Sequence, residues 1–420
     1  MNATNEMKNI VARARKGALA LAAMSRDKKN GLLLVMAEAL NEAKPRIKKA
    51  NEKDITTAAN AGKPEAFLDR LRLSDGRIDR MCAMMREVAA LDDPVGAVLE
   101  SIKRPNGLII KKVRVPIGVI GIIYESRPNV TAECIALCLK SGNAVILRGG
   151  RDVINSNKAI YETVRNASRK AGLDADAFIL IENTARVFVD AMLKASPGID
   201  LIMPRGGESL IEEVTNKSRV PVIKHYKGIC HIYVDAHADL DMAEKICFNA
   251  KVQRPGVCNA METMLVHEDV AEKFLPGLAA RMREAGVVLK GCPETRRILG
   301  RGGADPAEEK DYATEWLDLV LNIRVVKTTE DAIRHITMFG SNHSDAIITE
   351  NKEIAVEFTQ KVDSAAVYVN ASTRFTDGGE FGKGAEIGIS TDRLHARGPV
   401  GVEELTTYKY VIYGNGQVRE

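Results

Sequence analysis

One cysteine stands directly after a Pro-Gly turn, and its setting gives this sequence its clearest chemical potential. Cys258 closes the run Gln253-Arg254-Pro255-Gly256-Val257-Cys258 and precedes an apolar stretch that we expect to be a strand. A thiol on such a loop is placed to project into a cleft, where backbone amides can stabilise a thiolate or an oxyanion. Because free cysteine is among the most buried residue types, this feature alone favours a core side chain over a nucleophile.

Two expected strand ends carry paired glycines beside cations. Leu147-Arg148-Gly149-Gly150-Arg151 closes one strand, and Met203-Pro204-Arg205-Gly206-Gly207 closes another just before a helix. Glycines let a ligand approach the backbone, and helix N-termini favour phosphates. Either motif alone is more typical of an ordinary βα turn, whereas two of them on neighbouring strands favour a cofactor cleft. The chain has no G-x-G-x-x-G fingerprint after its first strand, so a dinucleotide would bind by this route.

Potential metal ligands are few and poorly spaced. Cys134 and Cys138 lie four positions apart on an expected helix, but no second pair stands at ligand spacing, so core packing is favoured. His225, Cys230 and His231 cluster without carboxylates and are more typical of a cleft edge. We therefore predict no metal site.

The elements that must position these residues form two alternating series of strands and helices. The segment up to about residue 90 has apolar residues at helical spacing. Beyond it, strands that are apolar throughout alternate with helices, which predicts an α/β fold with two doubly wound domains. The expected strands are 119–123, 144–147, 178–181 and 199–203, then 231–234, 263–266, 287–289, 320–326, 346–348 and 366–369.

The two series meet near residue 225, which predicts the domain boundaries. We assign residues 1–105 and 119–225 to a nucleotide-binding domain, and residues 226–370 to a catalytic domain that carries Cys258. Residues 106–118 and 395–420 are assigned to a small β element. The strands expected near 108–116 and 405–413 are polar and open-edged, so they could pair in a ribbon that bridges subunits of a homo-oligomer.

The composition excludes several classes of partner. The chain has 45% hydrophobic and 28% charged residues and a net charge of only +4, which gives no support to nucleic-acid or membrane-surface binding. It lacks a long apolar run and a signal-peptide pattern, and its seven cysteines are scattered, as in reduced proteins. We therefore expect a cytoplasmic location.

Several motifs resemble those of the aldehyde dehydrogenase superfamily. Pro116-Ile117-Gly118-Val119 is similar to its entry strand, Ser141-Gly142-Asn143-Ala144-Val145 to its next strand, and Cys258 falls where it keeps its nucleophile. Within it, the γ-glutamyl phosphate reductase (glutamate-5-semialdehyde dehydrogenase) family is most similar. The motifs that carry this resemblance are the stretch 253–259, Tyr124-Glu125-Ser126-Arg127-Pro128-Asn129-Val130-Thr131, Gly384-Ala385-Glu386-Ile387-Gly388 and His395-Ala396-Arg397-Gly398-Pro399.

The resemblance implies an aldehyde-dehydrogenase-like fold and a specific reaction. It implies NADPH-dependent reduction of L-γ-glutamyl 5-phosphate to L-glutamate 5-semialdehyde and phosphate in proline biosynthesis, through a thioacyl intermediate on Cys258. Backbone amides near Cys258, with the side chain of Asn129, would stabilise the oxyanion. The alternatives are a coenzyme-A-acylating aldehyde dehydrogenase and a catalytically silent nucleotide-binding subunit.

Two departures from ordinary aldehyde dehydrogenases sharpen this reading. Their water-activating glutamate is replaced here by the segment 225–228, His-Tyr-Lys-Gly, which suits an enzyme that must not hydrolyse its acyl group. Arg148 and Arg151 stand where NAD-using relatives have a lysine and a ribose-binding glutamate. A cation at the second position favours the 2′-phosphate of NADP, so the first domain is expected to bind NADPH.

The remaining site predictions also follow from the resemblance. Glu315 is expected to hold the nicotinamide ribose, and the cofactor lies against Gly206 and Gly207. Arg127, Arg254 and Arg397 are expected to bind the substrate's anionic groups, and Glu386 its ammonium group. A separate glutamate 5-kinase supplies the labile substrate, because the chain has no room for that domain, and we expect the two enzymes to meet.

Overall fold

The computed structural model describes residues 3–173 and 175–419, and the chain divides into two compact units. Unit 1 comprises Met1–Lys224, Gly382–Gly388 and Val400–Glu420. Unit 2 comprises His225–Phe381 and Ile389–Pro399. The change of unit at residue 225 lies where the two predicted series of strands meet.

Unit 1 is built on a parallel sheet of order β5-β4-β3-β6. Its strands are β3 (Val119–Tyr124), β4 (Ala144–Gly149), β5 (Phe178–Leu180) and β6 (Leu201–Arg205). All six residues of β3 are buried, because helices cover both faces of the sheet. Successive side chains point to opposite faces, so Ile120 and Ile122 join one core while Val119 and Ile123 join the other.

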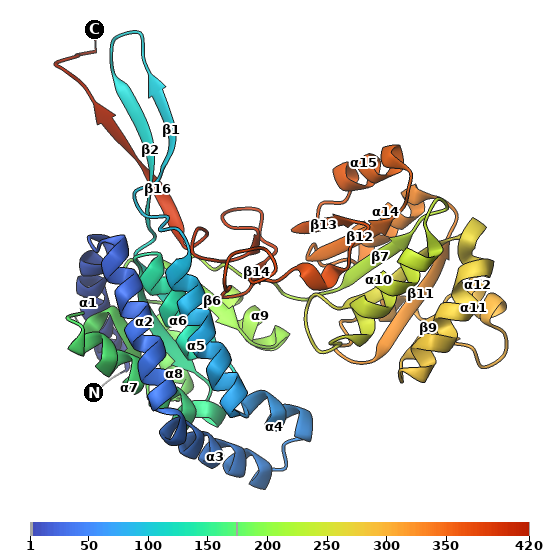
Figure 1. Ribbon diagram of the computed structural model, residues 1–420, viewed down its shortest axis with the longest axis horizontal. Coiled ribbons are helices and arrows are strands. Elements are labelled where there is room, and N and C mark those ends of the chain that lie inside the picture. The colour runs from blue at the N-terminus through green and yellow to red at the C-terminus, as the bar shows by residue number, and fades with distance from the viewer. Residues whose placement is uncertain (1–2, 174, 420) are drawn as a thin grey trace. The chain divides into compact units, whose positions relative to one another are not determined.

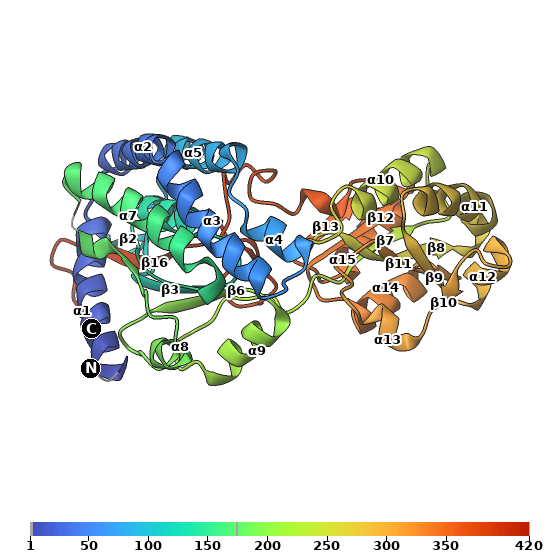
Figure 2. The same ribbon diagram turned by 90° about the horizontal axis from the view of Figure 1, so that it is seen from below.

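The helices of unit 1 form two layers on this sheet, as Figures 1 and 2 show. The N-terminal segment is helical, as its periodicity predicts: α1 (Ala3–Ala22), α2 (Arg26–Glu42), α3 (Lys44–Asn60), α4 (Glu65–Leu71) and α5 (Asp75–Ala90). The crossover helices and 3₁₀ turns are α6 (Val130–Lys140), η1 (Arg151–Val153), α7 (Ile154–Lys170), η2 (Ala175–Ala177), α8 (Arg186–Leu193) and α9 (Glu208–Lys217). Helices α2, α5, α6 and α7 enclose one core, and α1 and α8 enclose the other.

A three-stranded antiparallel sheet extends from unit 1 as a ribbon (Figure 1). It contains β1 (Val98–Lys103), β2 (Ile109–Pro116) and β16 (Thr406–Tyr413). The predicted pairing of β2 with the C-terminal strand is present, with Thr406 opposite Pro116 and Tyr413 opposite Ile109. The strand β1 lies inside the segment assigned to the nucleotide-binding domain, and its residues are exposed on both faces.

The predicted C-terminal β segment 395–420 is not continuous. Only β16 joins the ribbon, whereas Gly398–Pro399 forms the short strand β15, which pairs with β14 (Ile389–Ser390) in unit 2. Gly398 has a φ of +87° and Pro399 has no N–H to donate, so the chain cannot continue one ladder through this point.

Unit 2 contains a seven-stranded, all-parallel sheet of order β10-β9-β11-β8-β7-β12-β13. Its strands are β7 (Cys230–Val234), β8 (Met261–His267), β9 (Val288–Gly291), β10 (Asp305–Pro306), β11 (Val320–Val326), β12 (Ser344–Ile348) and β13 (Ala366–Val369). Its helices are α10 (Leu240–Val252), α11 (Glu268–Glu284), α12 (Pro293–Leu299), α13 (Glu309–Tyr312), α14 (Thr329–Phe339) and α15 (Lys352–Lys361), with the 3₁₀ turn η3 (Thr373–Phe375). Helices α10 and α11 cover one face of the sheet, and α14 covers the other (Figure 2).

Candidate active site

Cys258 lies on the loop between α10 and β8, at the amino-terminal edge of the unit 2 sheet. It is partly exposed, whereas the other six cysteines are buried. A reagent or substrate in solution can therefore reach this thiol in preference to the others in the folded protein.

The segment 225–228 packs directly against Cys258. A Cβ atom added to Gly228 would lie 2.0 Å from the carbonyl oxygen of Cys258 and 2.5 Å from its Cα, so only glycine fits there. The thiol of Cys230 donates a hydrogen bond of 3.2 Å to the same carbonyl. The loop that carries Cys258 is thus held by the segment that leads into β7. Because β7 pairs with β8, this contact lies where the two strands begin.

Replacing Gly228 by alanine is expected to lower kcat by about 100-fold, because the new methyl group displaces the backbone of Cys258 by the order of an ångström. Steady-state kinetics checks this. The matched control is Gly31→Ala inside α2, where an added Cβ meets nothing within 4 Å. That change should leave kcat within about twofold and stabilise the helix by about 0.5–1 kcal/mol. Equal kcat values in the two variants would contradict the placement of Gly228 beside the reacting residue.

Glu315 reaches the same point from another loop. Its Oε1 accepts a hydrogen bond of 2.9 Å from the backbone N–H of Gly228. The structure therefore brings together Glu315 and Cys258, which the sequence predicted as parts of one site. The segment 225–228 carries no carboxylate of its own, but the backbone of Gly228 is bound by that of Glu315.

A buried ion pair supports the loop that carries Cys258 at both ends. Lys251 Nζ lies 2.9 Å from Glu262 Oε2, and both side chains are 0% exposed. Lys251 precedes the loop and Glu262 follows it, while Glu262 Oε1 accepts a bond of 3.1 Å from the N–H of Leu317. Burial raises the pKa of Glu262 to about 7 and nearby Glu315 adds to the rise, while Lys251 opposes it.

The turn η3 closes the site on the other side of Cys258. Asn259 donates from Nδ2 to the carbonyls of Arg374 (3.3 Å) and Thr376 (2.9 Å), and Thr373 Oγ1 donates to the carbonyl of Asn259 at 2.7 Å. Arg374 Nε in turn donates to Gln253 Oε1 at 2.9 Å. This segment therefore contacts the loop both before and after the thiol.

The other predicted residues of unit 2 differ in their surroundings. Arg254 is exposed on the loop that carries Cys258. Arg397 is already engaged, because Nη1 and Nη2 donate to the side chain and the carbonyl of Asp363, each at 2.6 Å. A substrate anion at Arg397 would have to compete with this carboxylate.

The carboxyl edge of the unit 1 sheet carries all of the predicted cofactor residues except Glu315, which belongs to unit 2. Tyr124 at the end of β3 lies opposite Gly149 of β4 and Arg205 of β6, so the three strand ends adjoin. Arg148 donates to the carbonyl of Thr184 at 2.5 Å, and its buried Nε has no hydrogen-bond partner among the residues that the structure describes. Arg151 is exposed one residue after the Gly149-Gly150 pair.

Two of the paired glycines have packing reasons for their small size. A Cβ at Gly149 would lie 2.1 Å from Asn157 Nδ2, and one at Gly206 would lie 2.4 Å from Glu125 Oε2. Added Cβ atoms at Gly150 and Gly207 meet no atom closer than 3.6 Å. The N–H of Gly207 donates to Glu125 Oε2 at 3.1 Å, so a carboxylate of the chain itself holds this amide at the start of α9.

The remaining predicted residues, Arg127, Asn129 and Glu386, also belong to unit 1. Asn129 precedes α6, and its Nδ2 donates to Glu133 Oε1 at 2.6 Å. The roles predicted for these residues toward the substrate remain predictions.

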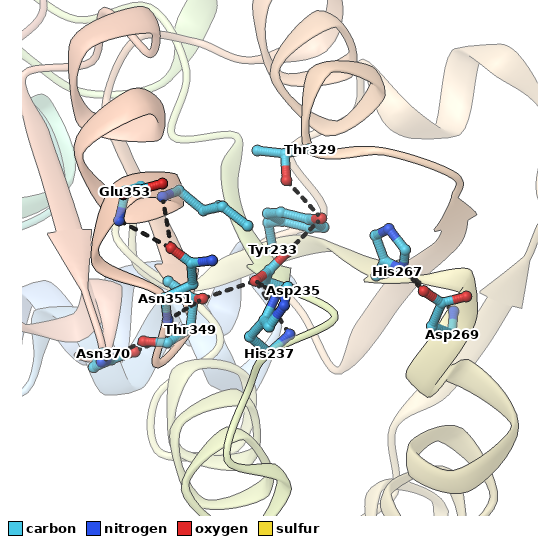
Figure 3. Close-up of polar contacts among 11 residues, drawn as sticks. Tyr233, Asp235, His237, His267, Asp269, Thr329, Thr349, Asn351, Glu353 and Asn370 are labelled. Carbon is cyan, nitrogen blue, oxygen red and sulfur yellow. Dashed lines mark hydrogen bonds and ion pairs between the residues drawn. The ribbon is translucent and has the colours of Figure 1, made fainter.

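A second polar network occupies the opposite, carboxyl edge of the unit 2 sheet (Figure 3). Buried Asp235 follows β7 and accepts bonds from Tyr233 (3.1 Å), Thr349 (2.7 Å) and the backbone of His237 (3.2 Å). These bonds satisfy its carboxylate inside the protein. The network therefore joins the ends of β7 and β12 and is separate from the Cys258 edge.

Comparison with known proteins decides the family. A model described as the aldehyde dehydrogenase family matches residues 2–295. The γ-glutamyl phosphate reductase of Moorella thermoacetica is 54% identical over 420 residues, with 100% of both chains covered. The solved structure of the enzyme of that name from Thermotoga maritima is 48% identical, with a TM-score of 0.96 over 99% of this chain and 100% of that one.

The chain belongs to the aldehyde dehydrogenase family. Within that family it groups with the γ-glutamyl phosphate reductases, as its motifs predicted. A glyceraldehyde-3-phosphate dehydrogenase from Methanocaldococcus jannaschii, solved with NADP, is 18% identical, with a TM-score of 0.70 over 98% of this chain and 95% of that one. This more distant likeness confirms the aldehyde-dehydrogenase-like fold.

Sequence reasoning missed two features of this aldehyde dehydrogenase site, Arg374 and the Lys251–Glu262 pair. No local pattern marks them, because Arg374 is remote in sequence and the charged pair is recognised only by its complete burial.

Cys134 and Cys138 are 0% exposed in the core, as predicted. Among residues 3–173 and 175–419, no group of three or more His, Cys, Asp or Glu could hold a metal ion. No helix in that part of the chain is sufficiently long and apolar to cross a membrane.

Proposed function

We propose that this member of the aldehyde dehydrogenase family reduces L-γ-glutamyl 5-phosphate to L-glutamate 5-semialdehyde with NADPH, as a step of proline biosynthesis. The observation that carries the proposal is the packing of Gly228 on Cys258. It places the segment that lacks the water-activating carboxylate of ordinary relatives directly against the only partly exposed thiol of the seven. The names of the 54% and 48% identical relatives support the same substrate.

The reaction begins with the Cys258 thiolate. Its sulfur attacks the carbonyl carbon of the acyl phosphate, and the C–O bond to phosphate breaks, with the electron pair leaving on phosphate. Backbone amides of the loop stabilise the tetrahedral oxyanion, and Asn129 is proposed to assist. The product of this step is a thioester on Cys258.

Reduction then releases the aldehyde. NADPH, when bound, supplies the hydride that converts the thioester to a hemithioacetal. The C–S bond breaks, the electron pair returns to Cys258, and glutamate 5-semialdehyde leaves. Because the carboxylate of Glu315 accepts the Gly228 amide, it fixes the loop beside the thiol, and we propose that it also orients the nicotinamide ribose.

The carboxyl edge of the unit 1 sheet fits a phosphate-bearing nucleotide. The orphaned, buried Nε of Arg148 and the exposed guanidinium of Arg151 are donors suited to the 2′-phosphate of NADP. Open space above Gly150 and Gly207 suits close approach of the cofactor. Gly149 and Gly206 are proposed to shape the same turns.

Arg151→Glu is expected to lower kcat/KM for NADPH by about tenfold or more and to raise the relative use of NADH, because a carboxylate repels the 2′-phosphate and accepts a ribose hydroxyl. Kinetics with the two cofactors measures the change. Arg169→Glu, at the last turn of α7, is a charge-matched control that should leave the ratio unchanged. An unaltered NADPH preference in the Arg151 variant would remove Arg151 from the site.

Substrate binding is proposed to use charged side chains. Arg127, Arg254 and Arg397 are candidates for the phosphate and the α-carboxylate, and Glu386 for the α-ammonium group. For Arg397 this requires that Asp363 release one of its two contacts.

The three-stranded ribbon is proposed to bridge subunits of a homo-oligomer. Its outer strand β16 carries side chains that are about half exposed, at 48% for Tyr408, 54% for Tyr410 and 59% for Ile412. An open-edged sheet with such side chains is well suited to pairing with another copy. We place the enzyme in the cytoplasm, where it would meet the glutamate 5-kinase that supplies its labile substrate.

The reverse reaction distinguishes this function from its alternatives. Oxidation of glutamate 5-semialdehyde by NADP should require inorganic phosphate and should not respond to coenzyme A. A dependence on coenzyme A instead would assign the chain to the acylating branch, and absence of any oxidation would favour a silent nucleotide-binding subunit.

A further inference from the structure

Arg374 is anchored to both sides of the nucleophile. Its backbone carbonyl accepts the Asn259 side chain at 3.3 Å, one residue after Cys258. Its Nε donates to the side chain of Gln253 at 2.9 Å, five residues before Cys258. The guanidinium is therefore fixed beside the loop through one nitrogen, and its two terminal nitrogens remain for another acceptor.

The guanidinium of Arg374 lies near a second cation and forms no ion pair with the carboxylates of the described residues. Within residues 3–173 and 175–419, neither Arg374 nor Arg254 forms an ion pair. Burial lowers the pKa of Arg374, and the nearby positive charge of Arg254 lowers it further, while Cys258 and Asp377 act in the opposite direction. Asp377 directs its Oδ1 to the amides of Gly379 and Glu380. Two cations, the thiol and one carboxylate that is engaged by backbone amides thus share one neighbourhood, and the excess positive charge favours an anion there.

Arg397, the other unit 2 arginine predicted for the substrate, differs in this respect. Both of its terminal nitrogens already contact Asp363. Arg374 is therefore the better placed of the two to receive a free anion beside the loop that carries Cys258.

We infer that Arg374, aided by Arg254, binds the phosphate group that leaves from and returns to the acyl group on Cys258. This inference rests on the proposed function and specifies which residues recognise phosphate. In reduction, the cations stabilise the phosphate dianion as the C–O bond breaks. In oxidation, they hold inorganic phosphate while its oxygen attacks the thioester carbon, and the C–S bond breaks with the electron pair returning to sulfur. A planar guanidinium suits this role because it can donate two parallel bonds to phosphate.

The test is the phosphate dependence of semialdehyde oxidation by the full chain. In Arg374→Gln, the KM for phosphate should rise about 10- to 100-fold, as expected for the loss of charge-assisted bonds, while the KM for NADP stays within about twofold. Arg374→Lys keeps the charge but not the fork, so an intermediate increase is expected. Arg334→Gln on α14 is the control, since its guanidinium pairs with Asp331, and it should change neither constant.

A second readout needs no turnover. Inorganic phosphate should slow the alkylation of Cys258 by iodoacetamide in the parent protein. This protection should be lost in Arg374→Gln and reduced in Arg374→Lys, which keeps the charge. If the parent does not oxidise the semialdehyde but still shows phosphate protection that depends on Arg374, the proposed function fails and the anion site stands.

Unchanged phosphate KM and unchanged protection in both Arg374 variants would overturn the inference and leave Arg374 as a structural link to Gln253. A rise in the KM for the semialdehyde with phosphate unaffected would also overturn it, because Arg374 would then bind the α-carboxylate.

Discussion

Cys258→Ala is expected to lower the rate of acyl phosphate reduction by about 10⁴-fold or more, because in the proposed mechanism the thiolate forms the covalent bond on which both half-reactions depend. The loop should keep its conformation, since its contacts with Cys230 and Gly228 involve backbone atoms of residue 258. Steady-state kinetics in either direction, together with an unchanged unfolding midpoint, would establish the effect as chemical.

The matched control is Cys247→Ala. Cys247 lies in α10, fully buried in the unit 2 core, so its loss leaves a small cavity but touches no reacting atom. Its kcat should remain within about twofold of the parent value, with a lower stability. Comparable activity in the two variants would show that Cys258 is not the nucleophile of the reaction. Alkylation adds a direct check, because the folded parent should lose rapid labelling only when Cys258 is replaced.

Lys251→Met is expected to reduce the free energy of unfolding by about 3–5 kcal/mol, because it leaves the buried carboxylate of Glu262 without its cation. The loss should grow with pH. The pKa of Glu262 is raised from 4.5 to about 7 even beside Lys251, and removing the cation raises it further. The folded variant keeps its proton to a higher pH than the folded parent does, so the stability of the variant continues to fall above about pH 7, where that of the parent levels off.

The double variant Lys251→Met/Glu262→Met is the control for that effect. Replacing both charges by apolar groups of similar volume should recover most of the stability and remove the additional pH dependence. Denaturant unfolding at several pH values measures both. If Lys251→Met were as stable as the double variant at pH 8, the ion pair between Lys251 and Glu262 would not support the loop electrostatically.

The strands of this aldehyde dehydrogenase were predictable where the whole strand is buried. β3 is apolar throughout because helices cover both faces of a parallel sheet, and the sequence pattern records that burial directly. β1 escaped prediction for the opposite reason, since all of its residues are exposed and none has to alternate. Its position depends on pairing with β2, which a local pattern does not encode.

The sequence placed two residues of the candidate site together, but it did not reveal the residues that support them. Cys258 and Glu315 were expected in one site, and Gly228 brings them together through contacts on either side. The glycines at 149 and 206, expected to admit a ligand, are small because Asn157 and Glu125 crowd them. Arg374 reaches the loop from η3, over a hundred residues away along the chain, so spacing could not reveal it.

The central claim is that Cys258 carries an acyl group that passes to phosphate and not to water. Mixing the protein with glutamate 5-semialdehyde and NADP without phosphate tests it most directly. The account predicts a burst of about one NADPH per Cys258, followed by a stall until phosphate is added. Continued NADPH formation without phosphate would show hydrolysis of the thioester, and the absence of a burst would show that no acyl group forms on Cys258.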